Sequence, residues 1–234
     1  MGRGSSKAGG ISTAGVTTAQ TKTISKIANR TRNLKNEQYR VVNEDGEVVL
    51  TKQGVKGTVA TTVGEKREFL EGAATIHNHP DGGTFSEADI HDFGYGARQI
   101  TVASPEGTYT LKNDKYGTMD QYKGWRPMLD AMDKAGITKE VSYVDLRKQA
   151  ENSPKIKKLR KESNNIANEW LKQRNAGASA ETLQALYKKS DDVGAKLTKA
   201  VKDEVRRLET KPYDDFYKKN AKKYGFTYSF EKKG

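Results

Sequence analysis

Short apolar runs separated by turn residues occupy the first half of the chain and predict strands. A β-hairpin is expected over Glu37–Thr51, because Asp45-Gly46 stands between two runs rich in β-branched residues and favours a hairpin turn there. Ala73–His77 has the short apolar pattern of a buried strand. Gln99–Ala103 and Thr108–Lys112 flank a turn that contains Pro and Gly, and predict two further strands.

The second half of the chain shows the helical period instead. Apolar residues recur at spacings of three, four and seven from Leu183 to Leu208, which predicts one long helix with a single apolar stripe. Further helices are expected over Met119–Lys134, Lys155–Arg174 and Tyr213–Tyr224, and a terminal strand over Phe226–Phe230. The pattern predicts an α/β fold in which a sheet is flanked by helices, with a long antiparallel helical hairpin inserted into it or appended to it.

The stretch from Ile76 to Ile90 contains the residues with candidate chemistry. The chain has three histidines, and His77 and His79 lie two positions apart within this stretch. Side chains two residues apart on an extended chain project to the same side, so both imidazoles are expected to face one point. Ser86 and Asp89 are three apart and share a face of the helix that is expected to begin there. Two histidines and one carboxylate that converge form the ligand set of a catalytic zinc site, which leaves a fourth position for water.

The same residues also have simpler interpretations. Ser86 followed three positions later by Asp89 is close to a capping box, in which the two side chains satisfy backbone N–H groups at a helix start. This role is compatible with metal binding, because a capped helix start holds Asp89 rigidly toward the histidines. The third histidine, His91, lies on a different helical face from Asp89 and is expected to be structural or exposed, and Asp92 is a further polar group there.

The spacing His77-x-His79-Pro80 followed by Ser86-x-x-Asp89 resembles the signature of the JAB/MPN (JAMM) metalloenzymes. Members of that family are zinc-dependent peptidases and isopeptidases, including deubiquitinating enzymes. The resemblance implies a JAB/MPN-like mixed sheet, zinc bound by His77, His79 and Asp89, and Ser86 as a donor to the oxyanion of the tetrahedral intermediate. Six residues separate His79 from Ser86, one fewer than usual, and this shorter turn resembles JAB-like domains of phage head-associated and polymorphic-toxin proteins.

A general base is also implied by the resemblance, which covers about Glu37–Lys112. In the family, a Glu near the start of an early strand takes a proton from water, and Glu37 stands directly before the first expected strand. Glu37 is therefore the candidate base beside Ser86. The other acidic residues nearby are expected to be solvated at a turn or to lie in a short helix: Glu44, Glu47, Glu65, Glu68 and Glu71.

Charge is distributed unevenly along a chain whose formal net charge is +12. Residues 1–36 contain seven Lys and Arg and no acidic residue, residues 37–144 are net acidic, and residues 145–234 are again basic. Basic flanks suit nucleic acid or another polyanion, although solvated helix faces have the same composition. The chain has no cysteine and no apolar run of membrane-spanning length, and its polar N-terminal residues are not expected to form a signal peptide. We therefore expect a cytoplasmic location, or a virion-associated one if the protein is phage-encoded.

The patterns divide the chain into four expected segments. These are a basic flexible segment over 1–36 with a short helix from about residue 23, a metal-binding core over 37–114, a helical region over 115–209, and a helix and strand over 210–234 that return to the core.

The sequence is compatible with three functions. The motif favours a zinc-dependent hydrolase, a metalloprotease that acts on peptide or isopeptide-linked protein substrates. Alternatively, the chain is a structural or delivery protein of a phage particle, whose basic segments contact nucleic acid or capsid and portal proteins. A metal-dependent nuclease fits the positive charge, but the Ser86-x-x-Asp89 continuation favours the peptidase.

Overall fold

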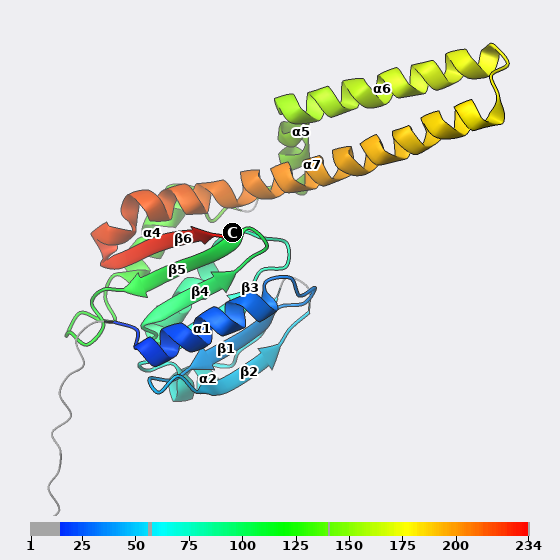
Figure 1. Ribbon diagram of the computed structural model, residues 1–234. Coiled ribbons are helices and arrows are strands. Elements are labelled where there is room, and N and C mark those ends of the chain that lie inside the picture. Colours follow the sequence, from blue (N-terminus) through cyan, green and yellow to red (C-terminus); the bar gives the residue numbers. More distant parts are fainter. Residues whose placement is uncertain (1–14, 56–57, 140, 234) are drawn as a thin grey trace, which may run out of the picture. The chain divides into compact units, whose positions relative to one another are not determined.

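The computed structural model describes residues 15–55, 58–139 and 141–233. The chain divides into two compact units, whose elements are labelled in Figure 1. The first unit contains the chain up to Lys139 together with Tyr213–Gly234, and the second contains Glu140–Pro212. The second unit is thus an insertion between two segments of the first. Of the two arrangements that the sequence left open for the helical hairpin, insertion is the one observed.

A six-stranded mixed sheet forms the centre of the first unit (Figure 1). Its strands are β1 (Gln38–Val42), β2 (Val48–Gln53), β3 (Ala74–Asn78), β4 (Gln99–Ala103), β5 (Gly107–Asn113) and β6 (Phe226–Lys232). The spatial order is β2-β1-β3-β4-β5-β6, in which β3 and β4 run parallel and the other neighbouring pairs are antiparallel. The expected α/β class, the hairpin and the return of the terminal strand to the sheet are confirmed.

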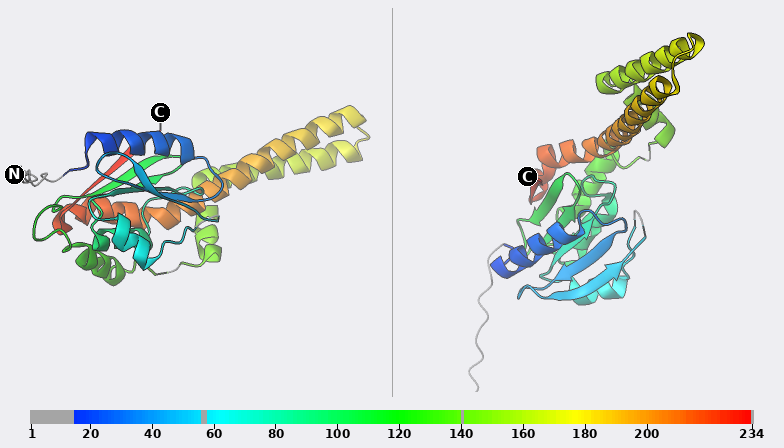
Figure 2. Two further views of the ribbon diagram at one scale, coloured as in Figure 1. Left: turned by 90° about the horizontal axis from the view of Figure 1, so that it is seen from below. Right: turned by 45° about the vertical axis from the view of Figure 1, so that its right-hand side comes forward.

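Helix α1 (Thr18–Thr31) covers part of one face of the sheet (Figure 2, left). Thr17 caps it, because its hydroxyl accepts a hydrogen bond from the Gln20 N–H and its own N–H donates to the Gln20 side chain. Ile24 and Ile27 are buried in one cluster with Ile76 of β3. The helix thus starts before the expected residue 23 and belongs to a core rather than to a flexible segment, since its apolar side chains find partners in the sheet. Residues 1–14 of that expected segment lie outside the described residues.

Several short elements cover the opposite face (Figure 2, left). They are α2 (Val63–Phe69), α3 (Glu87–Ile90), the 3-10 helix η1 (His91–Tyr95), α4 (Trp125–Lys134) and η2 (Ala221–Tyr224). Helix α4 begins at Trp125 instead of the expected Met119. Pro127 lies in its first turn, where a missing N–H removes no intrahelical hydrogen bond.

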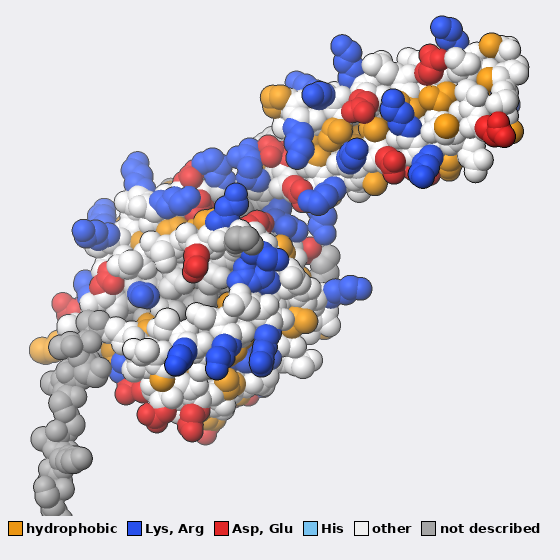
Figure 3. Space-filling view, viewed as in Figure 1, with side chains coloured by type: hydrophobic (Ala, Val, Ile, Leu, Met, Phe, Trp, Pro, Cys, Tyr) orange, Lys and Arg blue, Asp and Glu red, His pale blue; other side chains and the backbone are white. Residues whose placement is uncertain are grey.

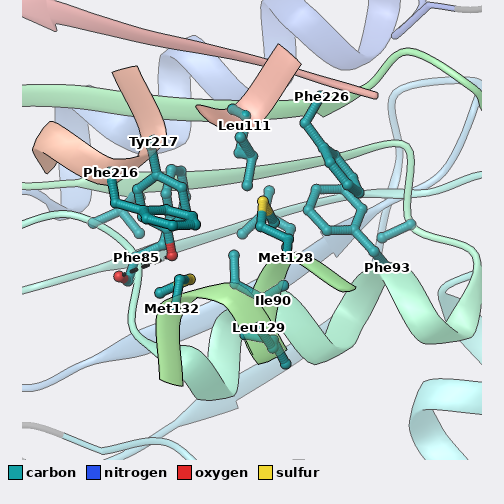
Figure 4. Close-up of a cluster of buried hydrophobic side chains, with 14 residues drawn as sticks. Phe85, Ile90, Phe93, Leu111, Met128, Leu129, Met132, Phe216, Tyr217 and Phe226 are labelled. Carbon is teal, nitrogen blue, oxygen red and sulfur yellow. Dashed lines mark hydrogen bonds between the residues drawn. The ribbon is translucent and has the colours of Figure 1, made fainter. Parts of the chain in front are cut away.

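The main core lies between these elements and the sheet (Figure 4). Phe93 of η1 packs on Phe226 of β6 with ring centroids 4.6 Å apart. Phe85 meets Tyr217 edge to face at 5.8 Å. The loop before α3 is therefore held by aromatic residues that lie far away in sequence, at the end of the chain.

The second unit consists of α5 (Tyr143–Glu151), α6 (Pro154–Asn175) and most of α7 (Ala180–Asn220). Helices α6 and α7 form the expected antiparallel hairpin (Figure 1). Leu146 and Ala150 of α5 pack with Ile156 and with Val205 of α7 in one cluster. The sequence patterns did not predict α5, because two buried apolar residues in nine positions make a weak periodic signal.

Helix α7 is one continuous helix of 41 residues that contains Pro212. The sequence predicted two helices here, one ending near Leu208 and one beginning at Tyr213, and that division is wrong. Proline removes one hydrogen bond from a helix interior and destabilises it by roughly 3 kcal/mol. Buried residues hold the helix on both sides of the proline, Val205 in the second unit and Tyr217 in the first. No helix in the described part of the chain is both long enough and apolar enough to cross a membrane.

Candidate metal centre

Strand β3 delivers the two histidines to one point. His77 lies in the strand opposite Val102 of β4, and His79 continues the extended chain, with its N–H donating to the Ala103 carbonyl at 3.0 Å. Because extended residues alternate, both imidazoles lie on the face opposite to α1, whereas Ile76 faces α1. The expected same-side projection of His77 and His79 is therefore observed.

A glycine turn and a capped helix bring the carboxylate to the histidines. The Gly82 N–H donates to the His79 carbonyl at 2.9 Å, and Gly82 and Gly83 both have positive φ, which allows the chain to reverse at once. Helix α3 then begins after Ser86. Its third residue, Asp89, points back to the histidines, with one carboxylate oxygen 3.1 Å from His77 Nε2.

The ligand atoms of His77, His79 and Asp89 have the spacing of a metal site. The two Nε2 atoms are 3.0 Å apart, and His79 Nε2 lies 3.9 Å from the second Asp89 oxygen. Zinc with bonds of about 2.0–2.1 Å in a tetrahedron places neighbouring ligand atoms roughly 3.3–3.4 Å apart. All three ligand atoms lie within 4.8 Å of one another, so this group can hold a metal ion with small adjustments.

Burial and mutual charge set the protonation of the three groups. Burial, and after it the neighbouring His77, lower the pKa of His79 to about 4. Burial alone would raise the pKa of Asp89, but His77 and His79 outweigh this effect and hold it below its usual range. Burial lowers the pKa of His77, yet attraction by Asp89 and Glu37 leaves it raised. Near pH 7 the centre therefore contains a carboxylate and a neutral imidazole, which are the protonation states that bind metals.

Glu37 lies beside this centre, directly before β1. Its side chain is 8% exposed, and its carboxylate interacts electrostatically with His77 and Asp89. Burial raises its pKa, the nearby His77 lowers it, and Asp89 raises it. A buried carboxyl with a raised pKa is suited to accept and return a proton near neutral pH.

Asn78, the residue between the two histidines, holds Glu37 in place. Its side chain points to the other face of β3 and is fully buried. Its Oδ1 accepts a hydrogen bond from the Gln38 N–H at 2.8 Å, and its Nδ2 donates to the Asn36 carbonyl at 3.1 Å. The two bonds clamp the backbone on both sides of Glu37. Sequence analysis missed this role, since an Asn between two His has no local signal for a partner 40 residues away.

Ser86 is the N-cap residue of α3, as its spacing to Asp89 predicts. Its N–H and its hydroxyl both donate to the same Asp89 oxygen, at 2.7 and 2.9 Å. The side chain is exposed, so a substrate can reach it. These contacts orient Asp89. The expected role of Ser86 as a donor to the oxyanion stays a prediction.

A hydrogen-bonded network of Tyr39, Lys66 and Asp92 lies next to the centre. Asp92, which is 3% exposed, accepts from the Tyr39 hydroxyl at 2.8 Å and from Lys66 Nζ at 2.7 Å. Tyr39 pairs with His77 across β1 and β3, and their ring centroids are 6.2 Å apart. Since Asp92 follows Asp89 by three residues, the network fixes the turn that carries the ligand. Burial raises the pKa of Asp92, and Lys66 and Tyr39 oppose that shift.

The remaining polar candidates lie outside the centre. His91 packs against the Trp125 ring at 5.3 Å, which agrees with the expected structural role. Glu44 forms an ion pair with Arg98, and Glu65 caps α2 and pairs with Lys52. Glu71 accepts hydrogen bonds from Tyr116 and Tyr122, Glu47 binds Asn43 in the hairpin turn, and Glu68 is exposed.

Comparison of the chain with protein-family models, with curated proteins and with solved structures gave no match. The functional conclusion therefore rests on the geometry of the site and on the resemblance of its motif.

Proposed function

We propose that the protein is a zinc-dependent hydrolase of peptide or isopeptide bonds, with His77, His79 and Asp89 as zinc ligands. The observation that carries this proposal is the convergence of two imidazole nitrogens and one carboxylate beside a buried glutamate. Two nitrogens and one oxygen from the protein, with a position left open, are typical of catalytic zinc. The spacing of the motif supports a peptidase of the JAB/MPN type.

A zinc ion at this position supplies Lewis-acid activation of a water molecule and of the substrate carbonyl. Glu37 accepts the proton of the attacking water and later returns it to the leaving amine, a role favoured by its raised pKa. Asn78 keeps Glu37 at the required place, and Ser86 orients Asp89. Ser86 also donates to the developing oxyanion when its hydroxyl turns toward substrate, a type of contact worth on the order of a hundredfold in rate.

Metal content of the purified protein, measured by mass spectrometry, tests the ligand set. We expect about one zinc per chain in the native protein, as the donor set implies, and none in His77→Ala/His79→Ala. His91→Ala is the matched control, since this third histidine is outside the cluster and its loss should leave the zinc content unchanged. A native protein that stays free of metal after zinc is supplied would exclude the proposed centre.

Activity is tested with a fluorogenic peptide library and with isopeptide-linked peptides. Glu37→Gln should keep its zinc and lose turnover, because the amide cannot accept the proton. A zinc-loaded native protein that cleaves no member of either set, but nicks plasmid DNA in the presence of divalent metal, would favour the nuclease instead.

A further inference from the structure

A polar groove lies on the face of the sheet opposite to the metal centre, next to α1. It has a volume of about 510 Å³, a size typical of ligand sites. Helix α1 and the two residues that follow it form one wall, from Thr21 to Asn33, and β4, β5 and β6 form the floor. We propose that this groove, called here the α1 groove, binds the phosphodiester backbone of a nucleic acid.

The floor of the α1 groove is a row of hydroxyl groups. Thr101 of β4 pairs with Thr110 of β5, which pairs with Ser229 of β6, so the three side chains follow one another across the strands. Thr108 lies beside this row on β5. Hydroxyls on neighbouring strands can donate to several oxygens of one phosphate, as Ser and Thr commonly do in contacts to nucleic-acid backbones.

The cationic groups around the groove are not neutralised by acidic ones. Of the residues that the structure describes, four cationic ones line the groove together with one acidic one, Glu231; the four are Arg32, Lys112, Lys232 and Lys233. None of these four cations forms an ion pair with a described residue. Figure 3 looks onto this side of the first unit, where Lys and Arg side chains are more numerous than Asp and Glu side chains.

Arg32 provides the most specific observation. Only 7% of it is exposed, yet its guanidinium has neutral partners, the Asn29 Oδ1 at 3.0 Å and the Thr108 Oγ1 at 3.4 Å. A buried guanidinium normally has an anion beside it, since burial of an unpaired charge is unfavourable. Its planar array of donors matches phosphate oxygens. An incoming phosphate would supply the missing anion at the edge of the groove.

The lining favours a backbone over a base or a peptide side chain. Among the described residues, no aromatic side chain lines the groove to stack on a base, and the apolar lining residues are Ile24 and Ala28. Cations on β5, at the end of β6 and directly after α1 suit a repeating anion better than a single one. The groove should therefore bind nucleic acid with little sequence preference and strong salt dependence.

The experiment measures fluorescence anisotropy of a labelled 20-nucleotide single-stranded DNA, and of its duplex, titrated with the full chain at 50 to 200 mM salt. Lys112→Ala/Lys232→Ala is the test variant, because both side chains are exposed and their loss should not disturb the fold. Lys123→Ala/Lys134→Ala is the matched control, which removes the same charge from exposed positions outside the groove.

We expect the test variant to bind DNA roughly tenfold more weakly than the native protein at 50 mM salt. The slope of the logarithm of its binding constant against the logarithm of the salt concentration should be shallower by about one to two, because each lost phosphate contact lowers this slope by about one. The affinity of the control variant for DNA should stay within about threefold of that of the native protein. The same holds for His77→Ala/His79→Ala, because the groove lies on the other face of the sheet, so the result does not depend on the proposed metal site. Equal weakening of test and control variants, or no binding at 50 mM salt, would overturn the proposal.

Competition separates the sources of phosphate. An unlabelled oligonucleotide should displace the probe at micromolar concentration, whereas inorganic phosphate and a mononucleotide should need millimolar amounts. If a mononucleotide displaces the probe at micromolar concentration, the ligand of the groove is a small phosphate ester and not a nucleic-acid backbone. Displacement by polyglutamate as effective as that by the oligonucleotide would show a general polyanion surface and refute recognition of phosphate.

Discussion

Replacement of Asn78 by alanine tests the clamp that holds Glu37 at the metal centre. The change removes two hydrogen bonds, to the Gln38 N–H and the Asn36 carbonyl, from a side chain with no exposed surface. Each bond contributes about 1 kcal/mol, and the partly buried Gln38 N–H that loses its partner adds a penalty of about 1–3 kcal/mol. The Asn36 carbonyl is at an exposed residue and recovers water, so we expect a total loss of about 2–4 kcal/mol.

Urea unfolding followed by tryptophan fluorescence measures this loss. A Trp170→Phe background leaves Trp125 as the reporter, so the signal follows the unit that contains the metal centre. Asn36→Ala is the control, because its exposed side chain makes none of these bonds and its loss should change stability by less than about 0.5 kcal/mol. Zinc content should persist in Asn78→Ala while turnover falls, since the ligands stay and the base shifts. A stability change below about 0.5 kcal/mol for Asn78→Ala would refute the clamp.

Three further predictions concern the same centre. Glu37→Gln should bind zinc as the native protein does and lose about 10²–10⁴ in kcat, and full activity would exclude Glu37 as the base. Asp92→Asn should weaken zinc binding by about 10- to 100-fold in a chelator competition, because the network with Tyr39 and Lys66 orients the ligand turn, whereas unchanged affinity would make the network purely structural. Zinc affinity should fall by about tenfold per pH unit as the pH drops below the raised pKa of His77, because the protonated ring cannot bind metal. A zinc affinity that is independent of pH between pH 5 and 7 would contradict the assignment of His77 as a ligand.

The placement of the candidate metal ligands was largely predictable from the sequence. Alternation along an extended chain fixes the common side of His77 and His79, and a spacing of three brings Ser86 and Asp89 together at a helix start. Both relations involve neighbours in sequence, so local geometry is sufficient. The position of Glu37 was expected only through a family resemblance, because no local rule relates a residue before β1 to the end of β3.

The local patterns of this chain determined its strands, its hairpin, the helical hairpin of α6 and α7, and the side of β3 on which the histidines lie. Contacts between distant segments decided the rest. Helix α1 became part of the first unit because the sheet buries Ile24 and Ile27, and α7 continues through Pro212 because residues on both sides of the proline are packed in cores. Asn78 can hold the backbone around Glu37 only because β1 lies beside β3 in the sheet. The α1 groove exists because one helix covers only part of a six-stranded sheet. Periodicity determines which face of an element is apolar, but the element that covers this face is selected by long-range packing, which no short stretch of sequence contains.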